Sequence, residues 1–149
     1  MAVKPIPDGY HSVTPYLVAQ GVATLIEFLK QAFEAQEIHR MPRPDGTIMH
    51  AQVRIGDSIV MMGEPMGELK PMPSSMYLYV NDADTIYKRA LQAGATSMME
   101  PADRFYGDRS AGIKDPVGNI WWIATHKEDV PPEELAKRAE AFMKQPPRG

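Results

Sequence analysis

A strand followed by an amphipathic helix occurs twice in this chain of 149 residues, and the two copies lie 61 positions apart, with Tyr16 aligned to Tyr77. In the first copy, a strand over 13–19 precedes apolar residues at helical spacing over 22–35. In the second copy, a strand over 76–80 precedes another helix. Each helix has one apolar face that must be buried on a sheet, so two similar modules are predicted.

Three further strands are predicted after each helix. The second helix is expected between Asp82, its N-cap, and Gly94, where it stops. Asp45-Gly46 is typical of a hairpin turn, and Gly56-Asp57 gives a second tight turn. The last three strands of each half should therefore form an antiparallel meander. These strands cover residues 36–42, 47–55 and 58–63 in the first half, and 96–100, 110–114 and 119–125 in the second.

The predicted fold class is α+β, with two βαβββ modules that form a curved mixed sheet around an internal cleft and with the helices outside. The first module covers residues 11–64 and the second covers 73–129. Pro131-Pro132 begins a C-terminal helix over 131–145, whose apolar stripe is expected to pack on the body or on a second subunit. Together these parts should form one structural domain.

Composition excludes several classes of protein. The formal net charge is -3, the pI is about 5.8 and the basic residues are scattered, which argues against a nucleic-acid-binding surface. The absence of cysteine excludes disulfides, thiolate metal sites and thiol catalysis. No run approaches the roughly 18 apolar residues of a membrane span, and the N-terminal residues lack a secretory pattern. We therefore expect a cytoplasmic protein with a small-molecule ligand.

Residues 115–126 combine a tight turn with a strand that contains two adjacent tryptophans. Gly118 supplies a permissive backbone and Asn119 tolerates a left-handed conformation, so the chain should reverse before the strand. Neighbouring residues of a strand point to opposite faces. Trp121 is therefore expected to pack under the second helix, and Trp122 is expected to face the cleft and to stack on a flat ligand. The alternative for Trp122 is that it fills the cleft as part of the core.

A family resemblance rests on Val13-Thr-Pro-Tyr-Leu-Val18, Ile48-Met-His-Ala-Gln-Val-Arg-Ile-Gly-Asp57 and Ala124-Thr-His-Lys-Glu-Asp-Val130. With the paired modules, the Asp-Pro-Val-Gly-Asn turn and the phrase Tyr106-Gly-Asp-Arg109, the chain resembles the vicinal oxygen chelate superfamily. This superfamily includes glyoxalase I, extradiol dioxygenases and bleomycin-resistance proteins. The resemblance covers residues 11–129, and within the superfamily it points to the PhnB-like branch.

The resemblance also implies where a metal would bind. In metal-using members the ligands are His, Gln or Glu in the first and last strands of each half. In this sequence those positions fall on Thr14, Ser75, Trp122 and either Val60 or Met62. A divalent cation needs several oxygen or nitrogen donors, so the inherited site is expected to be lost and no cofactor is expected. The alternative is a relocated metal site built from His50, Glu64 and His126.

Strand alternation selects candidates for the cleft. In strand 47–55 an apolar face should pack under the helices and consist of Met49, Ala51, Val53 and Ile55. The opposite, concave face carries His50, Gln52 and Arg54, which are candidates for polar contacts with a ligand. A solvated face or a subunit contact explains these polar residues equally well.

The same alternation places Val60, Met62 and Glu64 on one face of the next strand, so Met62 is expected to line the cleft. Glu64 is expected to be the pseudo-symmetric counterpart of His126. The loop over 105–112 adds Tyr106 and Arg109, which are expected to close over the ligand, with Arg109 binding an anion through two hydrogen bonds. The alternative for Arg109 is a local ion pair with Asp108.

Two functions follow from these candidates. The first is a protein that binds or sequesters a small aromatic or anionic compound without the usual metal, and that forms a homodimer. The second is a metal-dependent lyase, isomerase or dioxygenase, in which a carboxylate such as Glu64 would move a proton. The predicted ligand pocket consists of His50, Gln52, Arg54, Met62, Glu64, Tyr106, Arg109, Trp122 and His126.

Overall fold

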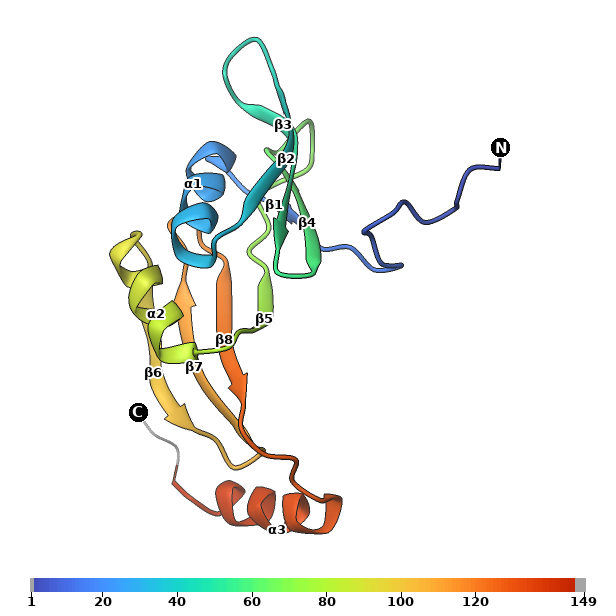
Figure 1. The fold of residues 1–149 in the computed structure, drawn as a ribbon. Coiled ribbons are helices and arrows are strands. Elements are labelled where there is room, and N and C mark those ends of the chain that lie inside the picture. Colours follow the sequence, from blue (N-terminus) through green and yellow to red (C-terminus); the bar gives the residue numbers. More distant parts are fainter. Residues whose placement is uncertain (1, 147–149) are drawn as a thin grey trace.

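The computed structural model describes residues 2–146 and contains two four-stranded sheets, each backed by one helix (Figure 1). The first sheet has the strand order β1-β4-β3-β2, in which β1 is parallel to β4 and the other pairs are antiparallel. The elements of this module are β1 (Tyr16–Val18), α1 (Val22–Phe33), β2 (Gln36–Pro42), β3 (Ile48–Ile55) and β4 (Ser58–Gly63).

The second module repeats this arrangement, with the strand order β5-β8-β7-β6 and with β5 parallel to β8. Its elements are β5 (Ser75–Tyr79), α2 (Ala83–Gln92), β6 (Thr96–Asp103), β7 (Asp108–Lys114) and β8 (Ile120–His126). The predicted α+β fold of two βαβββ modules with mixed sheets is therefore confirmed. The strands form two separate sheets rather than one continuous sheet.

The two modules meet through their helices, which lie beside each other in Figure 1. The buried apolar side chains form one cluster that draws on both modules. At the junction, the ring of Phe33 in α1 lies 5.1 Å from that of Trp121 in β8. Arg89 of α2 pairs with Glu34 at 3.0 Å and donates a hydrogen bond to the Gln31 carbonyl at 3.0 Å. Packing of the helices thus leaves the other face of each sheet uncovered by its own helix.

We call this uncovered side the open face of each sheet, and it corresponds to the predicted concave face. Strand register shows which residues lie there. Tyr16 of β1 pairs with Met61, and Tyr77 of β5 pairs with Trp122. Met61 is therefore the counterpart of Trp122, whereas Met62 is fully buried in the core. The prediction that Met62 lines the cleft is wrong, because a shift of one residue along a strand moves a side chain to the other face.

Two further predictions for the first module are wrong. The counterpart of His126 is Pro65 rather than Glu64, since the offset of 61 residues holds along both last strands. In β3, Met49 is 36% exposed and Ile48 is buried in its place. The expectation for Ala51, Val53 and Ile55 holds, because all three are buried under the helices.

The turn before β8 is held together by a buried carboxylate. Asp115 Oδ1 accepts hydrogen bonds from the backbone amides of Val117 and Asn119, both at 3.0 Å, and Oδ2 accepts from Trp121 Nε1 at 2.9 Å. The left-handed residue of this turn is Gly118, with φ of 103°, and not Asn119. Asn119 instead accepts a hydrogen bond from the Ser74 amide and ties the turn to β5.

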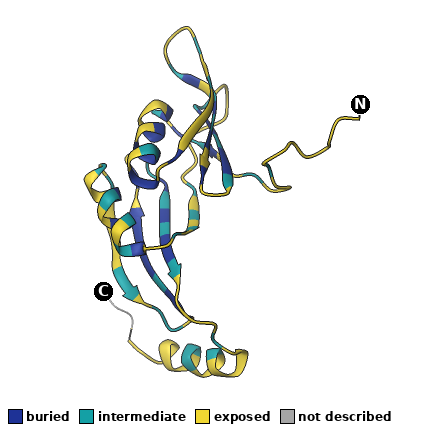
Figure 2. Cartoon of the chain, in the orientation of Figure 1, coloured by how far each residue is buried: buried dark blue, intermediate teal, exposed yellow. Residues whose placement is uncertain are grey.

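The C-terminal helix α3 (Pro132–Met143) lies beyond the end of the second sheet, on the side away from the first module (Figure 1). It buries no side chain completely, and most of it is exposed in Figure 2. Arg138 attaches it through the Phe105 carbonyl at 3.2 Å and Glu128 at 2.6 Å. Within residues 2–146, no helix combines the length and the apolar character of a transmembrane span.

Candidate ligand-binding site

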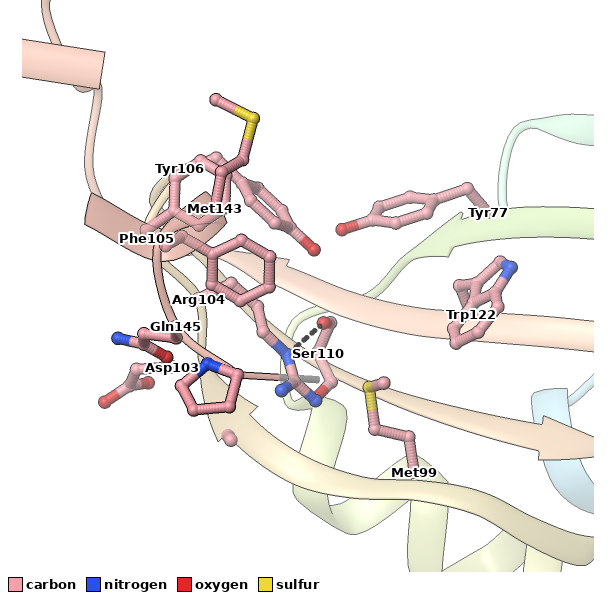
Figure 3. A pocket seen from close by; sticks show the side chains of 13 residues that line it. Tyr77, Met99, Asp103, Arg104, Phe105, Tyr106, Ser110, Trp122, Met143 and Gln145 are labelled. Carbon is pink, nitrogen blue, oxygen red and sulfur yellow. Dashed lines mark hydrogen bonds between the residues drawn. The ribbon is translucent and has the colours of Figure 1, made fainter. Parts of the chain in front are cut away.

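A cavity of about 980 Å³ lies between the open face of the second sheet, the turn that joins β6 to β7, and the C-terminal segment (Figure 3). Its walls are largely aromatic and sulfur-containing. The aromatic residues are Tyr77, Phe105, Tyr106, Trp122 and Phe142, and the methionines are Met99 and Met143. Of the pocket residues predicted from the sequence, Tyr106 and Trp122 line this cavity.

Trp122 is fixed in place by its two neighbouring strands. Its indole Nε1 donates to the Ser75 hydroxyl in β5 at 2.9 Å. On the other side it lies on Gly112 of β7, where an added Cβ would be 2.6 Å from Trp122 Cζ3. Only a residue without a side chain leaves room for the ring. The strand pairing therefore holds the indole flat on the sheet and exposes one surface of it to the cavity.

The residues at the usual metal positions do not fit a metal ion. Ser75 and Trp122 are hydrogen-bonded to each other, and the Thr14 hydroxyl donates to the His11 carbonyl at 3.3 Å. The Ser75 hydroxyl already accepts a hydrogen bond from the Trp122 indole, and the tryptophan ring has no donor atom for a metal. Neither residue can replace an imidazole or carboxylate ligand. Among residues 2–146, no three His, Asp or Glu side chains meet in a group that could hold a metal.

The three residues of the alternative metal site, His50, Glu64 and His126, lie in different parts of the structure. Glu64 accepts hydrogen bonds from the backbone amides of Ile48 and of Gly21, the latter at 2.8 Å. Glu64 thus connects the residue before α1 to the start of β3. His50 lies on the first open face and His126 on the second, so these three side chains do not come together in one chain.

Asp108 is the most heavily bonded carboxylate beside the cavity, and it is only 4% exposed. It accepts hydrogen bonds from Tyr77 at 2.7 Å and from Tyr79 at 3.0 Å, and its Oδ1 lies 2.8 Å from His126 Nδ1. Burial alone would raise the pKa of Asp108, but the hydrogen bonds from His126, Tyr77 and Tyr79 outweigh it and hold the pKa below its ordinary value. Asp108 therefore stays ionised beneath the two tyrosines.

His126 lies between two carboxylates. Its Nδ1 faces Asp108, and its Nε2 lies 2.7 Å from Asp129 in the segment that leads to α3. The hydrogen bond to Asp108 first, and that to Asp129 second, raise the pKa of His126 above its ordinary value. The imidazole thus connects the sheet to the segment before α3. His126 does not itself line the cavity, but its partner Asp108 is bonded to Tyr77, which does.

Tyr77 and Tyr106 face each other across the cavity, with their hydroxyl groups directed toward one another (Figure 3). Burial, followed by hydrogen bonds with Asp108 and Tyr106, raises the pKa of Tyr77. Burial and Asp108 likewise raise the pKa of Tyr79. Both phenols therefore remain protonated near neutral pH and act as hydrogen-bond donors to Asp108.

The predicted role of Arg109 is wrong. β7 begins at Asp108, so Arg109 is a strand residue whose side chain points to the helix side, opposite to Asp108. Its Nε and Nη2 donate to the two carboxylate oxygens of Asp84 in α2 at 2.7 and 2.9 Å, and its Nη1 donates to Asp103 at 3.3 Å. Arg109 thus anchors α2 and neither covers the cavity nor pairs with Asp108.

The predicted residues of β3 lie on the first open face, away from the large cavity. His50 is 3.2 Å from the Tyr16 hydroxyl and 3.0 Å from Gln52 Nε2, and Tyr10 donates to Gln52. These groups satisfy one another within the first module. Arg54 is exposed and borders a smaller cavity of about 620 Å³ between the modules.

Eleven residues that line the large cavity were missed from the sequence, among them Tyr77, Arg104 and Phe142. The sequence could have indicated Tyr77, because it lies in the strand that pairs with β8, beside Trp122 and on the same face. Arg104 and Phe142 had no such signal, because both reach the cavity from segments whose positions depend on tertiary packing. The ring of Phe142 in α3 lies 5.0 Å from that of Phe105.

Comparison with known proteins agrees with this fold. Residues 10–123 match the sequence profile of the glyoxalase/bleomycin resistance protein/dioxygenase superfamily. The uncharacterized protein Mb0911c of Mycobacterium bovis is 33% identical over 135 residues, which cover 83% of this chain and 89% of that protein.

Two solved structures illustrate the structural similarity. TioX from Micromonospora sp. ML1 has a TM-score of 0.67 at 23% identity, covering 78% of this chain and 98% of TioX. A putative 3-demethylubiquinone-9 3-methyltransferase, PhnB protein, from Bacillus cereus has a TM-score of 0.59 at 15% identity, covering 77% of this chain and 99% of that one. At these identities the similarity concerns the fold alone.

Proposed function

The chain belongs to the glyoxalase/bleomycin resistance protein/dioxygenase superfamily, and within it we propose that this protein binds or sequesters a small aromatic compound without the usual metal. The observation that carries the proposal is the cavity of about 980 Å³ on the second open face, walled by five aromatic side chains. Ligand sites are typically concave, of about 300–1,000 Å³, and lined by apolar and aromatic groups with a few polar ones.

Trp122 is the proposed stacking surface. Its orientation is preset by Ser75 and Gly112, so little conformational freedom would be lost on binding. Offset stacking of aromatic rings contributes about 0.5–1.5 kcal/mol beyond the burial of area. Tyr77 and Tyr106 flank the same space, and Met99 offers a polarizable side chain that adapts to ligand shape. This set favours a flat compound over an extended polar one.

A thermal-shift experiment tests this function. The full chain is screened against planar aromatic compounds and, separately, against Zn²⁺, Mn²⁺, Ni²⁺ and Fe²⁺. A compound at 100 times its dissociation constant should add about 2.7 kcal/mol to the free energy of unfolding. Stabilisation by a divalent metal alone would support the metal-dependent lyase, isomerase or dioxygenase instead.

Matched variants locate the site. Trp122→Leu should abolish or strongly weaken stabilisation by the aromatic compounds, because the stacking surface is lost. Met61→Leu occupies the counterpart position on the first open face and should leave that stabilisation unchanged. Equal ligand responses in wild type and Trp122→Leu would refute the proposed site.

We also propose that the protein is a cytoplasmic homodimer of the PhnB-like branch. Support for the dimer comes from large side chains exposed on both open faces: Tyr16 is 47%, Tyr77 is 44% and Tyr79 is 60% exposed. Large side chains exposed on a protein surface often take part in an interface. Sedimentation equilibrium at micromolar concentration measures the mass directly, and a single monomeric species would contradict the dimer.

A further inference from the structure

Arg104 is a cation in the wall of the proposed ligand cavity, and its head group is held by neutral acceptors. It follows β6 in the turn that leads to β7, and it is partly buried. Its Nε donates to the Ser110 hydroxyl at 3.0 Å, and its Nη2 donates to the backbone carbonyls of Ser110 and Glu100 at 2.9 and 3.1 Å. These bonds fix the guanidinium plane but leave its charge uncompensated.

Other arginines near the second sheet do have carboxylate partners. Arg109 pairs with Asp84 and Asp103, and Arg138 pairs with Glu128 and Glu134. Within the part of the chain that the structure describes, Arg104 forms no ion pair with a carboxylate. The positive charge in the cavity wall is therefore available to a ligand.

The two carboxylates nearest to the cavity do not compete for Arg104. Asp103 lines the cavity but pairs with Arg109, and its side chain is 79% exposed. Asp108 accepts hydrogen bonds from two phenol hydroxyls, and its Oδ1 lies 2.8 Å from His126 Nδ1, so its carboxylate oxygens are already occupied. The cavity thus combines one cation with a mainly apolar wall, where electrostatic attraction is stronger than in water.

We propose that Arg104 binds an anionic group of the ligand, so that the preferred ligand is a planar aromatic compound that carries a carboxylate or a similar oxyanion. This inference rests on the proposed function. Figure 3 places Arg104 and Ser110 on one side of the cavity and Trp122 on another, with Met99 between them. A ring stacked on Trp122 can therefore direct its anionic group toward Arg104 and the Ser110 hydroxyl. The planar guanidinium suits an oxyanion better than a lysine would.

Two probes of equal shape test the inference by isothermal titration calorimetry: 2-naphthoate, which is anionic, and 2-naphthamide, which is neutral. Wild type should bind 2-naphthoate at least tenfold more tightly, since hydrogen bonds to charged groups exceed neutral ones. Arg104→Gln should reduce 2-naphthoate binding to the level of 2-naphthamide. Arg104→Lys keeps the charge and should retain part of the preference, which guards against a merely misfolded Arg104→Gln variant.

Arg89→Gln is the matched control, because it removes a guanidinium from α2, on the helix side of the second sheet and outside the cavity wall, and leaves the Arg109–Asp103 pair in place. It should keep the wild-type preference. Equal affinity of wild type for both probes, or a preference that survives Arg104→Gln, would overturn the role of Arg104 while leaving Trp122-dependent binding of 2-naphthamide intact. Failure of both probes to bind would instead contradict the proposed aromatic site, and the anion site with it.

Discussion

The two modules share one scaffold but differ in the row of four side chains that crosses each open face. In the first sheet the row is Tyr16, Met61, Gln52 and His39. In the second sheet the paired positions are Tyr77, Trp122, Gly112 and Met99. Both rows begin with a tyrosine. The decisive difference is at the two central positions. The first row has Met61 beside Gln52, whereas the second row has the large ring of Trp122 beside Gly112.

This difference explains why only one open face has the large cavity. On the first face, Gln52 reaches Tyr10 and His50, and His50 reaches Tyr16, so the polar groups satisfy one another. On the second face, Gly112 contributes no side chain, and the exposed surface of Trp122 forms one wall. The same backbone thus supports a closed polar network in one module and an aromatic cavity in the other.

The largest effect is expected from giving the second row a side chain at its glycine. Gly112→Ala should destabilise the protein by about 1–3 kcal/mol, because the new Cβ overlaps the Trp122 ring, which its hydrogen bond to Ser75 holds in place. Urea unfolding measures the change. The double variant Gly112→Ala with Trp122→Leu should recover most of the loss, and no recovery would show that the ring is not the cause.

Gln52 occupies the position in the first row that corresponds to Gly112 in the second. Gln52→Ala removes hydrogen bonds to Tyr10 and His50 on a partly exposed face, so its cost should be about 1 kcal/mol or less. A loss equal to that of Gly112→Ala would mean that the two rows are equally constrained.

The next effect concerns Asp108, whose hydrogen-bond network has no equivalent in the first module. Asp108→Asn should cost about 1–2 kcal/mol, because buried hydrogen bonds from Tyr77, Tyr79 and His126 lose their charged acceptor. Asp103→Asn changes an exposed carboxylate of the same hairpin and should have a smaller effect. Chemical unfolding of both variants distinguishes the two positions, and equal losses would contradict the buried network.

A smaller, pH-dependent effect should come from the same network. The raised pKa of His126 means that its stabilising contribution is complete below its ordinary value of 6.5 and is lost as pH rises through the folded-state pKa. The lowered pKa of Asp108 acts in the opposite sense, because its contribution is present above 3.8 and is lost as pH falls through its folded-state pKa.

Melting temperatures of wild type and His126→Gln, recorded between about pH 5 and 9, check this prediction. The advantage of wild type over the variant should shrink as the pH increases. Asp129→Asn removes one carboxylate beside His126 and should move the loss to lower pH. A difference between wild type and His126→Gln that does not vary with pH would contradict the network.

The smallest effect on the free energy of unfolding is expected at the C-terminal helix, which lines the cavity on the second open face. Arg138→Ala should change the free energy of unfolding by less than about 1 kcal/mol, because its ion pairs are solvent-exposed. It should nevertheless increase hydrogen exchange and proteolysis of residues 132–143, since α3 buries no side chain completely. Lys144→Ala, at the exposed end of the helix, is the control. Unchanged exchange would show that other contacts hold α3.

Much of the fold follows from local signals in the sequence. The predicted bounds of β2 and β4 are the observed ones, and those of α1, β3 and β8 agree within two residues. These elements have clear periodicity and are bounded by turns whose residues fix the backbone locally. The Asp115–Asn119 turn formed as expected, although the left-handed residue is Gly118.

The errors at the site have two physical causes. Met62 was placed on the wrong face because a strand has a period of two, and a one-residue offset reverses every side chain. Arg109 was placed over the cavity because β7 was expected to start at residue 110, whereas the ladder extends to Asp108. In both cases, the sequence pattern did not fix the register or the first residue of the strand, and pairing with a neighbouring strand did.

The sequence by itself determined the two βαβββ modules, the turn that precedes β8, and the opposite directions of Trp121 and Trp122, because these depend on neighbouring residues and backbone preference. Only the tertiary structure decided that the large cavity lies on the second module, that Asp108 organises Tyr77, Tyr79 and His126, and that Arg104 lacks a carboxylate partner among residues 2–146. Those features require strand register and the docking of α3, which bring together residues up to 69 positions apart, as from Tyr77 to Pro146.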